Sequence, residues 1–394
     1  MTSDPRDHAP AYRRLVLAVL IGTIGSIGMW SFVVALPAVQ ADFGASRADA
    51  SLPYTLTMIG FAFGGVLMGR LEDRWGILAP LLIGALSIAA GFIAGALAPN
   101  LIWYGLAQSL VGLGASASFV PLMADISHWF VRRRGLAVAI ASSGNYLAGT
   151  LWPPVLQHFI TVEGWRPTHL ATGVLCLLVL VPLAFLMRAR PPMDADSAKA
   201  PNARHGAPDI SQRALLVLLI VAGFACCVAM AMPQVHLVAY CVDLGYGPAR
   251  GAQMLSLMLG LGIVSRLLSG FVADRIGGLL TLMIGSSLQG LALFLYVFFD
   301  GLTSLFVISA LFGLFQGGIV PMYAIIVREC FPAAKIGGTL GLVIMATLIG
   351  MAVGGWMSGL VFDLTGSYQV AFFNGLAWNL LNLAICAFLL WRKR

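Results

Sequence analysis

An arginine lies inside an apolar stretch of this sequence. Residues 261–278 read LGIVSRLLSGFVADRIGG, and the acidic residues nearest to Arg266 along the chain are Asp243 and Asp274. A guanidinium in hydrocarbon costs several kcal/mol, so this side chain must face water, a polar group or a ligand. Its planar fork matches a carboxylate, which it can hold with two parallel hydrogen bonds. Arg266 is the first candidate for binding an anionic substrate; the alternative is a structural arginine bonded to helix carbonyl groups.

Two titratable side chains are candidates for carrying a proton. His236 lies a few residues before Asp243, and histidine changes its charge close to neutral pH. A hydrogen-bonded histidine in the protein core is the alternative. Asp125 lies shortly before the basic residues 132–134, and pairing with them or with a helix end is favoured there over a role in proton coupling.

Other polar and aromatic side chains are expected at the depth of Arg266. Asn145 and Tyr146 could hold a substrate oxygen, as could Gln316 and Tyr323, and Trp30 could form an apolar wall. Each could equally serve an interhelical hydrogen bond or simple packing. The spans contain no HExxH, GxSxG or paired-carboxylate site, no nucleotide-binding loop and no metal-ligand spacing of the six cysteines. We therefore expect neither catalysis, nor a cofactor, nor a metal.

The elements that carry these residues are membrane spans. The chain has 394 residues, of which 59% are hydrophobic and 10% are charged, against about 25% charged residues in soluble proteins. About 20 apolar residues cross a bilayer core. The runs without any charged residue are 15–41, 50–69, 135–162, 167–187, 214–242, 276–299, 301–327, 336–362 and 364–391. With 75–124, which breaks at Ala98–Asn100, and with 248–272, they predict an all-α membrane protein of twelve transmembrane helices.

The basic residues are distributed unevenly about these spans. With a cytoplasmic N-terminus, only Arg47, Arg166 and Arg250 fall in external loops and Arg266 in the membrane. All other Lys and Arg residues are cytoplasmic, which follows the positive-inside rule. The net charge of +7 is then topological and indicates no nucleic-acid partner. We expect a monomer in a bacterial inner membrane, with both termini cytoplasmic and the lipid bilayer as its surroundings.

The chain also repeats itself. GRLEDRWG at Gly69 recurs as GFVADRIG at Gly270, and VPLMA at Val120 recurs as VPMYA at Val320, at nearly the same separation. The repeat predicts two six-helix bundles, residues 1–188 and 213–394, joined by a cytoplasmic linker at 189–212. Transporters built from repeated bundles bind their substrates near the midplane between the repeats.

The repeated loop pattern is the basis of a family resemblance. It stands at Gly69, Leu71, Asp73, Arg74 and Gly76, with a weaker copy at Gly270, Asp274, Arg275 and Gly277. This pattern resembles that of the major facilitator superfamily. HWFVRRRGLAVAIASSG (128–144) and GWRPTHLATG (164–173) resemble its monocarboxylate and oxalate transporter branch.

The resemblance implies roles for some of these residues. Asp73 would stabilise the state closed to the cytoplasm, and we expect Gly69, Asp73, Arg74, Asp274 and Arg275 to form a cytoplasmic gate. The resemblance also implies that Arg266 binds the substrate. Departures occur where branch members carry further charges: Gly262 replaces an Asp, residues 25–32 lack an acid and 336–362 lack a Lys.

The leading hypothesis is a secondary active transporter of a small organic anion, in the first place a monocarboxylate, coupled to H⁺. The alternative is an exporter or importer of a bulkier aromatic or amphipathic solute. An intramembrane enzyme or a receptor that does not transport is the third class, and the lack of catalytic motifs argues against the enzyme.

Overall fold

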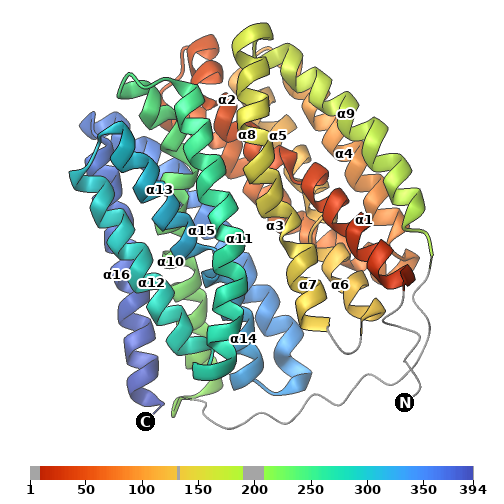
Figure 1. The fold of residues 1–394 in the computed structure, drawn as a ribbon, viewed down its shortest axis with the longest axis vertical. Helices are drawn as coiled ribbons and strands as arrows, with labels where there is room; N and C mark the ends of the chain where they lie inside the picture. Colours follow the sequence, from red (N-terminus) through yellow and green to blue (C-terminus); the bar gives the residue numbers. More distant parts are fainter. Residues whose placement is uncertain (1–8, 131–133, 190–207, 394) are drawn as a thin grey trace. The chain divides into compact units, whose positions relative to one another are not determined.

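The computed structural model describes residues 9–130, 134–189 and 208–393, and in these ranges every regular element is an α-helix (Figure 1). The helices are α1 (Ala9–Gly25), α2 (Ile27–Phe43), α3 (Arg47–Trp75), α4 (Leu78–Ala96), α5 (Leu101–Ala117), α6 (Val120–Trp129), α7 (Arg134–Ser142), α8 (Gly144–Glu163), α9 (Trp165–Leu186), α10 (Gln212–Asp243), α11 (Pro248–Ile276), α12 (Gly278–Phe298), α13 (Leu302–Gln316), α14 (Ile319–Cys330), α15 (Ala333–Thr365) and α16 (Tyr368–Arg392).

These helices combine into the predicted membrane spans. Within the described residues, 11 helical stretches are long and apolar enough to cross a bilayer. Three of them join two helices each, namely α1 with α2, α5 with α6, and α13 with α14. The pair α7–α8 occupies the remaining predicted span, residues 135–162, which is not among these 11 stretches. The prediction of an all-α membrane protein with twelve spans is confirmed.

Two of the helix breaks fall at equivalent positions of the repeat. α5 ends at Ala117 and α6 begins at Val120, while α13 ends at Gln316 and α14 begins at Ile319. Pro121 and Pro321 follow these breaks in the repeated Val-Pro sequence. A proline disfavours helical geometry in the residue before it and is tolerated in the first turn of a new helix. The sequence repeat is therefore also a repeat of local structure.

The chain divides into two compact units. The first holds residues 1–45 and 52–196, and the second holds 46–51 and 197–394. In the first unit α4 packs against α5 and α9, and α2 against α8; in the second, α10 packs against α15 and α16, and α11 against α13 (Figure 1). The first turn of α3 thus belongs to the second unit, although the rest of α3 belongs to the first. Residues 190–207 of the predicted linker lie outside the described residues.

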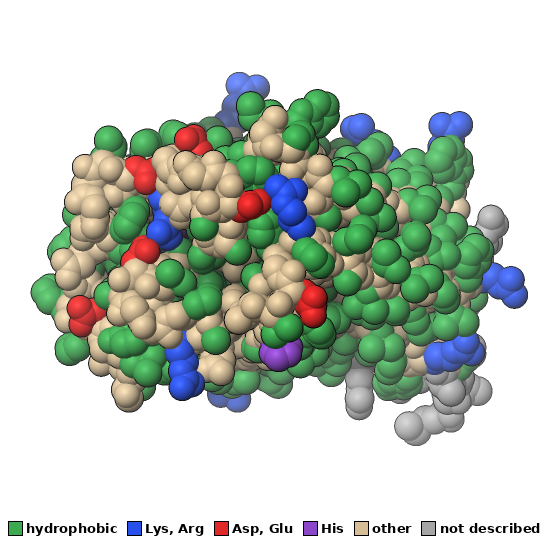
Figure 2. Space-filling model, turned by 90° about the horizontal axis from the view of Figure 1, so that it is seen from above, with side chains coloured by type: hydrophobic (Ala, Val, Ile, Leu, Met, Phe, Trp, Pro, Cys, Tyr) green, Lys and Arg blue, Asp and Glu red, His purple; other side chains and the backbone are tan. Residues whose placement is uncertain are grey.

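Large apolar side chains cover much of the surface. Phe63, Leu97, Ile102 and Phe271 are each at least 66% exposed. Figure 2 shows hydrophobic side chains over much of the visible face, interrupted by scattered charged ones. Soluble proteins rarely expose apolar patches of this extent, whereas a bilayer solvates them. The apolar exterior agrees with the membrane spans.

Glycines bring α11 and α13 into direct backbone contact. A Cβ atom on Gly313 would overlap the carbonyl oxygen of Met258, and one on Gly317 would overlap that of Gly262. Small residues at helix crossings are the usual means of close packing in membranes, where lipid offers no hydrophobic driving force between helices. The position of α11, and of the arginine on it, therefore depends on these two glycines.

We expect Gly313→Ala to destabilise the protein. The added methyl has no room beside the Met258 carbonyl, and overpacking of this kind costs about 1–3 kcal/mol. Thermal unfolding in detergent should show a lower melting temperature than that of the parent. Gly337→Ala on α15 is the matched control, because a Cβ there meets nothing within 4 Å. Equal melting temperatures of the two variants would contradict the close packing described here.

Candidate functional site

Arg266 lies in the middle of an unbroken helix. α11 runs from Pro248 to Ile276, so the helical rise applies along its length and Arg266 lies about 12 Å from Asp274 along the axis. The side chain is half-buried, and its Nε lies 3.4 Å from the carbonyl oxygen of Gly317. That distance is long for an N–H···O hydrogen bond. Because α11 is continuous from Arg266 to Asp274, the helical rise can be used to estimate how deep Arg266 lies in the span.

A buried glutamine lies next to the Gly317 carbonyl. The side chain of Gln316 is fully buried, and its Oε1 accepts a 2.7 Å hydrogen bond from Nε2 of Gln234 on α10. Its own Nε2 has no acceptor among the described residues. A buried amide donor without a partner costs about 1–3 kcal/mol, which a ligand oxygen would recover. Gln316 therefore offers a hydrogen-bond donor at the α11–α13 junction.

Tyr323 faces a different neighbour. Its hydroxyl donates to Oδ1 of Asn382 on α16 at 3.0 Å, and Asn382 donates in turn to Oγ of Ser286 at 2.8 Å. All three are buried in the second unit. This network supports the alternative of an interhelical hydrogen bond for Tyr323, which was predicted as a possible substrate contact.

In the first unit the structure brings two predicted site residues together. Nε1 of Trp30 on α2 donates to the backbone carbonyl of Asn145 on α8 at 3.1 Å. Nδ2 of Asn145 lies 3.1 Å from Sδ of Met29, a weak acceptor. Tyr146 is buried beside them. The α2–α8 contact thus brings together the indole N–H of Trp30, the backbone and carboxamide of Asn145 and the sulfur of Met29.

Asp125 forms a buried ion pair. Its two carboxylate oxygens accept hydrogen bonds from Nε and Nη2 of Arg14 at 2.6 and 2.7 Å, and both side chains are 4% exposed. The guanidinium also lies 4.6 Å from the ring centroid of Trp129. The sequence favoured the basic residues 132–134 as partners, and their side chains lie outside what the structure describes. The observed partner comes from α1, because packing places α1 beside α6.

The predicted cytoplasmic gate residues lie at helix ends. Asp73 and Arg74 are exposed at the end of α3, and Asp274 and Arg275 are exposed at the end of α11. No ion pair joins any of the four to another described residue, and Arg74 instead lies 5.6 Å from the ring of its neighbour Trp75. Gly69 also has open space, since a Cβ there would meet nothing within 4 Å. The gate therefore stays a prediction for these residues.

Asp73→Asn is expected to lower the turnover of transport by about tenfold while the KM changes little, because the carboxylate would act on one conformational state and not on the substrate. Initial rates in proteoliposomes over a range of substrate concentrations separate the two parameters. Glu163→Gln is the matched control, being an exposed acid at the end of α8. A variant with the parent's turnover would remove Asp73 from the gate.

His236 is enclosed by hydrogen bonds. Its Nε2 lies 2.7 Å from the carbonyl oxygen of Gly355 on α15, and its Nδ1 lies 3.3 Å from the hydroxyl of Tyr368 on α16. The ring is fully buried. The same tyrosine accepts a hydrogen bond from Arg47, so His236 is one step from a charged group. His236 is therefore a hydrogen-bonded core histidine, and it is also linked to Arg47 through Tyr368.

Three partners in these arrangements were missed from the sequence. From the sequence, Arg14 was counted among the cytoplasmic charges, Arg47 was placed in an external loop, and Gln234 was not considered. The structure instead places Arg47 as the first residue of α3, only 7% exposed. Helices extend beyond charge-free runs, so a charge at a span boundary can be helical and buried. Polar residues inside apolar runs were the only signal, and they did not identify the partner.

The buried polar side chains described above are the guanidiniums of Arg14 and Arg47, the carboxylate of Asp125, the imidazole of His236, and carboxamides and hydroxyls. No three metal-ligating side chains come together in the described ranges.

Comparisons with known proteins agree with the architecture. Residues 18–308 match the family model of the Major Facilitator Superfamily. Monocarboxylate transporter 13 of Bos taurus is 29% identical over 371 residues, covering 90% of this chain and 82% of that protein. The uncharacterized MFS-type transporter YcxA of Bacillus subtilis is 27% identical over 371 residues, covering 90% of each.

A crystal structure shows the same fold. A bacterial homologue of the human lysosomal transporter Spinster, in an inward-facing and occupied conformation, superposes with a TM-score of 0.73 at 15% identity, covering 100% of this chain and 96% of that one. The predicted likeness to monocarboxylate transporters is confirmed by the relatives, and transporters rather than enzymes make up this group. The chain belongs to the major facilitator superfamily.

Proposed function

We propose that this protein is a secondary active transporter of a small organic anion, most directly a monocarboxylate, and that it works by alternating access with Arg266 binding the carboxylate. The observation that carries the proposal is the guanidinium at mid-span on α11, bonded to the α13 terminus where Gln316 leaves a buried amide donor without an acceptor among the described residues. The Arg266 guanidinium and the Gln316 amide are thus two hydrogen-bond donors at the contact between α11 and α13.

The chemistry of these donors favours a carboxylate. The guanidinium fork can present two parallel N–H groups to a carboxylate, and the Gln316 amide could donate to a further oxygen of the solute. Binding would offset the charge of Arg266 and so favour closure of the site around a neutral pair. A ligand shifts a conformational equilibrium only through such a difference in affinity between states.

Three residues of the first unit remain predicted substrate contacts. Trp30 and Asn145 already contact each other, with Tyr146 buried beside them. We infer that the indole contacts the carbon chain of the substrate, and that Asn145 turns its carboxamide from the Met29 sulfur to a substrate oxygen. The Sδ acceptor is weak, so this exchange costs little.

Proton coupling completes the proposal. The two candidates for the proton carrier are His236, whose ring bonds to Tyr368, and Asp125, whose carboxylate is held by Arg14. We further propose that the protein is a monomer in a bacterial inner membrane, with both termini cytoplasmic as the positive-inside distribution indicates. In that orientation the end of α10 and the start of α11 face outward.

A substrate screen in liposomes tests this function. The purified protein is reconstituted, and uptake of radiolabelled monocarboxylates, dicarboxylates and neutral or cationic solutes is measured with and without an inward proton gradient. Monocarboxylate uptake that rises with the gradient is the expected result. Movement of bulky aromatic or amphipathic solutes, with no uptake of small anions, would replace the proposal by the alternative function.

A further inference from the structure

The first turn of α3 is held tightly by the second unit. Residues 46–51 belong to this unit, whereas α3 from Leu52 onward belongs to the first. Gly359 of α15 allows the close approach, because a Cβ there would come within 2.8 Å of the Arg47 carbonyl oxygen and 3.0 Å of the Ala48 Cα. The turn is therefore seated directly against the backbone of α15.

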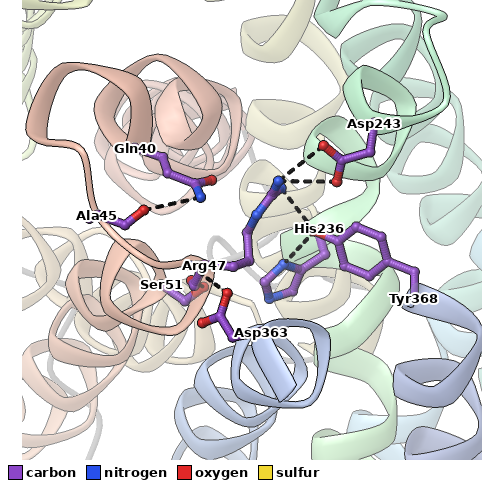
Figure 3. Close-up of polar contacts among 8 residues, drawn as sticks. All are labelled: Gln40, Ala45, Arg47, Ser51, His236, Asp243, Asp363 and Tyr368. Atoms are coloured by element: carbon purple, nitrogen blue, oxygen red, sulfur yellow. Dashed lines mark hydrogen bonds and ion pairs between the residues drawn. The ribbon is translucent and has the colours of Figure 1, made fainter. Parts of the chain in front are cut away.

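An acidic residue of α15 caps this turn. The carboxylate of Asp363 accepts hydrogen bonds from the backbone N–H groups of Arg47, at 2.9 Å, and of Ala48, at 2.7 Å (Figure 3). The first N–H groups of a helix lack intrahelical acceptors, and a carboxylate there also favours the positive end of the helix dipole. Helix caps usually come from the residue just before the helix. Here Ser46 accepts from the Asp49 N–H in that way, and a distant part of the chain supplies the acceptor for the two N–H groups before it.

The side chain of Arg47 is held as well. Its Nη2 donates to both carboxylate oxygens of Asp243, at 3.0 and 3.1 Å, and its Nη1 donates to the hydroxyl of Tyr368 at 2.9 Å (Figure 3). The guanidinium carbon also lies 5.0 Å from the ring centroid of Phe362. We call Arg47, Asp243, Asp363, Tyr368 and His236 the α3 clasp.

Hydrogen-bond directions in the clasp require a neutral histidine. The carbonyl of Gly355 can only accept, so Nε2 of His236 carries a proton and donates to it. In the neutral ring Nδ1 is then an acceptor, which takes the hydroxyl proton of Tyr368. The tyrosine oxygen remains free to accept from Arg47. The hydrogen bonds from Arg47 Nη1 to Tyr368, from Tyr368 to His236 and from His236 to Gly355 therefore all run in one direction.

A second proton on the ring reverses this order. Nδ1 would become a donor facing the Tyr368 hydroxyl, whose own proton would lose its acceptor. The imidazolium would also place a positive charge two hydrogen bonds from the Arg47 guanidinium. Both effects oppose the contact that holds Arg47.

We propose that His236 is a proton-binding site, and that a proton on its Nδ1 releases the first turn of α3 from the second unit. The proton comes from water when the turn leaves, binds the Nδ1 lone pair and breaks no covalent bond of the protein. Because the closed clasp fits the neutral ring, protonation favours the open clasp. The inference rests on the proposed proton-coupled transport, and it assigns the coupling to His236 rather than to Asp125.

The remaining charged groups near the ring are few. Arg47 and Asp363 are the charged residues that act on His236 directly, with opposite signs. Asp243 binds the far side of Arg47, and Tyr240 of α10 packs edge-on against Tyr368. α11 and α14 also pack on α10, and among their described residues neither places a charge against the ring. The effect of the ring proton is therefore exerted mainly on Arg47.

Alkylation of a buried cysteine tests release of the turn. Ala50 is fully buried on α3, so Ala50→Cys should react with a maleimide only when the turn leaves its seat. In purified protein in detergent we expect the rate to rise by about tenfold or more between pH 8 and pH 5.5, across the range in which histidine changes charge. Adding His236→Gln, which keeps an amide donor for Gly355, should abolish this rise. Arg47→Gln or Asp243→Asn should give fast alkylation at both pH values.

Built-in controls separate release from unfolding. Cys330 is only half-buried, so Cys330→Ser is included in every variant. The other native cysteines are buried, so labelling of this background without Ala50→Cys reports unfolding. Arg250→Gln is the matched charge control, because Arg250 is exposed and bonds to Gln253 on its own helix. A pH response that persists with His236→Gln, or slow alkylation with both Arg47→Gln and Asp243→Asn, would overturn the proposal. The assay contains no substrate, so either result leaves the anion-transport proposal to its own test.

Discussion

Replacing Arg266 with alanine should reduce kcat/KM for carboxylate uptake by about 30- to 4,000-fold, since removing one partner of a desolvated, hydrogen-bonded charge pair costs about 2–5 kcal/mol. Arg266→Lys should recover only part of this loss, because an ammonium keeps the charge but lacks the planar fork. Initial uptake rates in proteoliposomes, measured against substrate concentration, give the two parameters.

A structural role for Arg266 would give a different pattern. If the side chain only braced the α13 terminus through the Gly317 carbonyl, Arg266→Ala would lower the melting temperature while KM stayed at the parent value. Arg250→Ala is the control, since it removes an exposed arginine from the first turn of the same helix. Parent-like KM in Arg266→Ala would contradict carboxylate binding at this residue.

The largest effect on stability is expected at the buried ion pair of the first unit. Asp125→Ala leaves the Arg14 guanidinium buried without its counter-charge, and breaking such a pair costs about 3–5 kcal/mol. The melting temperature in detergent should fall by several degrees. The double variant Arg14→Met, Asp125→Leu should recover much of the loss, because it removes both charges and keeps the volume filled.

An exposed ion pair in the same unit provides the comparison. Arg166 and Asp42 lie 3.0 Å apart with side chains 37% and 44% exposed. Exposed pairs contribute about 0–1 kcal/mol, so Asp42→Ala should hardly change the melting temperature. Equal losses for Asp42→Ala and Asp125→Ala would show that burial of the Arg14–Asp125 pair has no energetic consequence.

The spans were predictable because hydropathy and charge act over about twenty residues at a time. The breaks between α5 and α6 and between α13 and α14 were not predicted, since they depend on two or three residues around Pro121 and Pro321 whose effect is local. The repeated Val-Pro sequence did mark both places. The sequence alone did not indicate that each of these spans consists of two helices.

The partners of buried polar residues could not be predicted in the same way. Sequence gives the depth of Arg266, His236 or Asp125 from helix rise, but not the direction in which each side chain points. Arg14 pairs with a residue 111 positions away, and the clasp joins Arg47 to Asp243 across 196 positions. Contacts at such separations depend on how helices rotate and pack, which one sequence does not specify.

The backbone contact between α11 and α13 has a consequence for how force would pass through the molecule. Gly313 and Gly317 leave no side chain between the two helices that could compress or change rotamer. A displacement of Arg266 on α11 is therefore expected to move α13 with it, so that the two helices behave as one rigid body. In the proposed transport cycle, the conformational change at Arg266 would then be a rigid-body movement of the α11–α13 pair and not a rotamer change of one side chain.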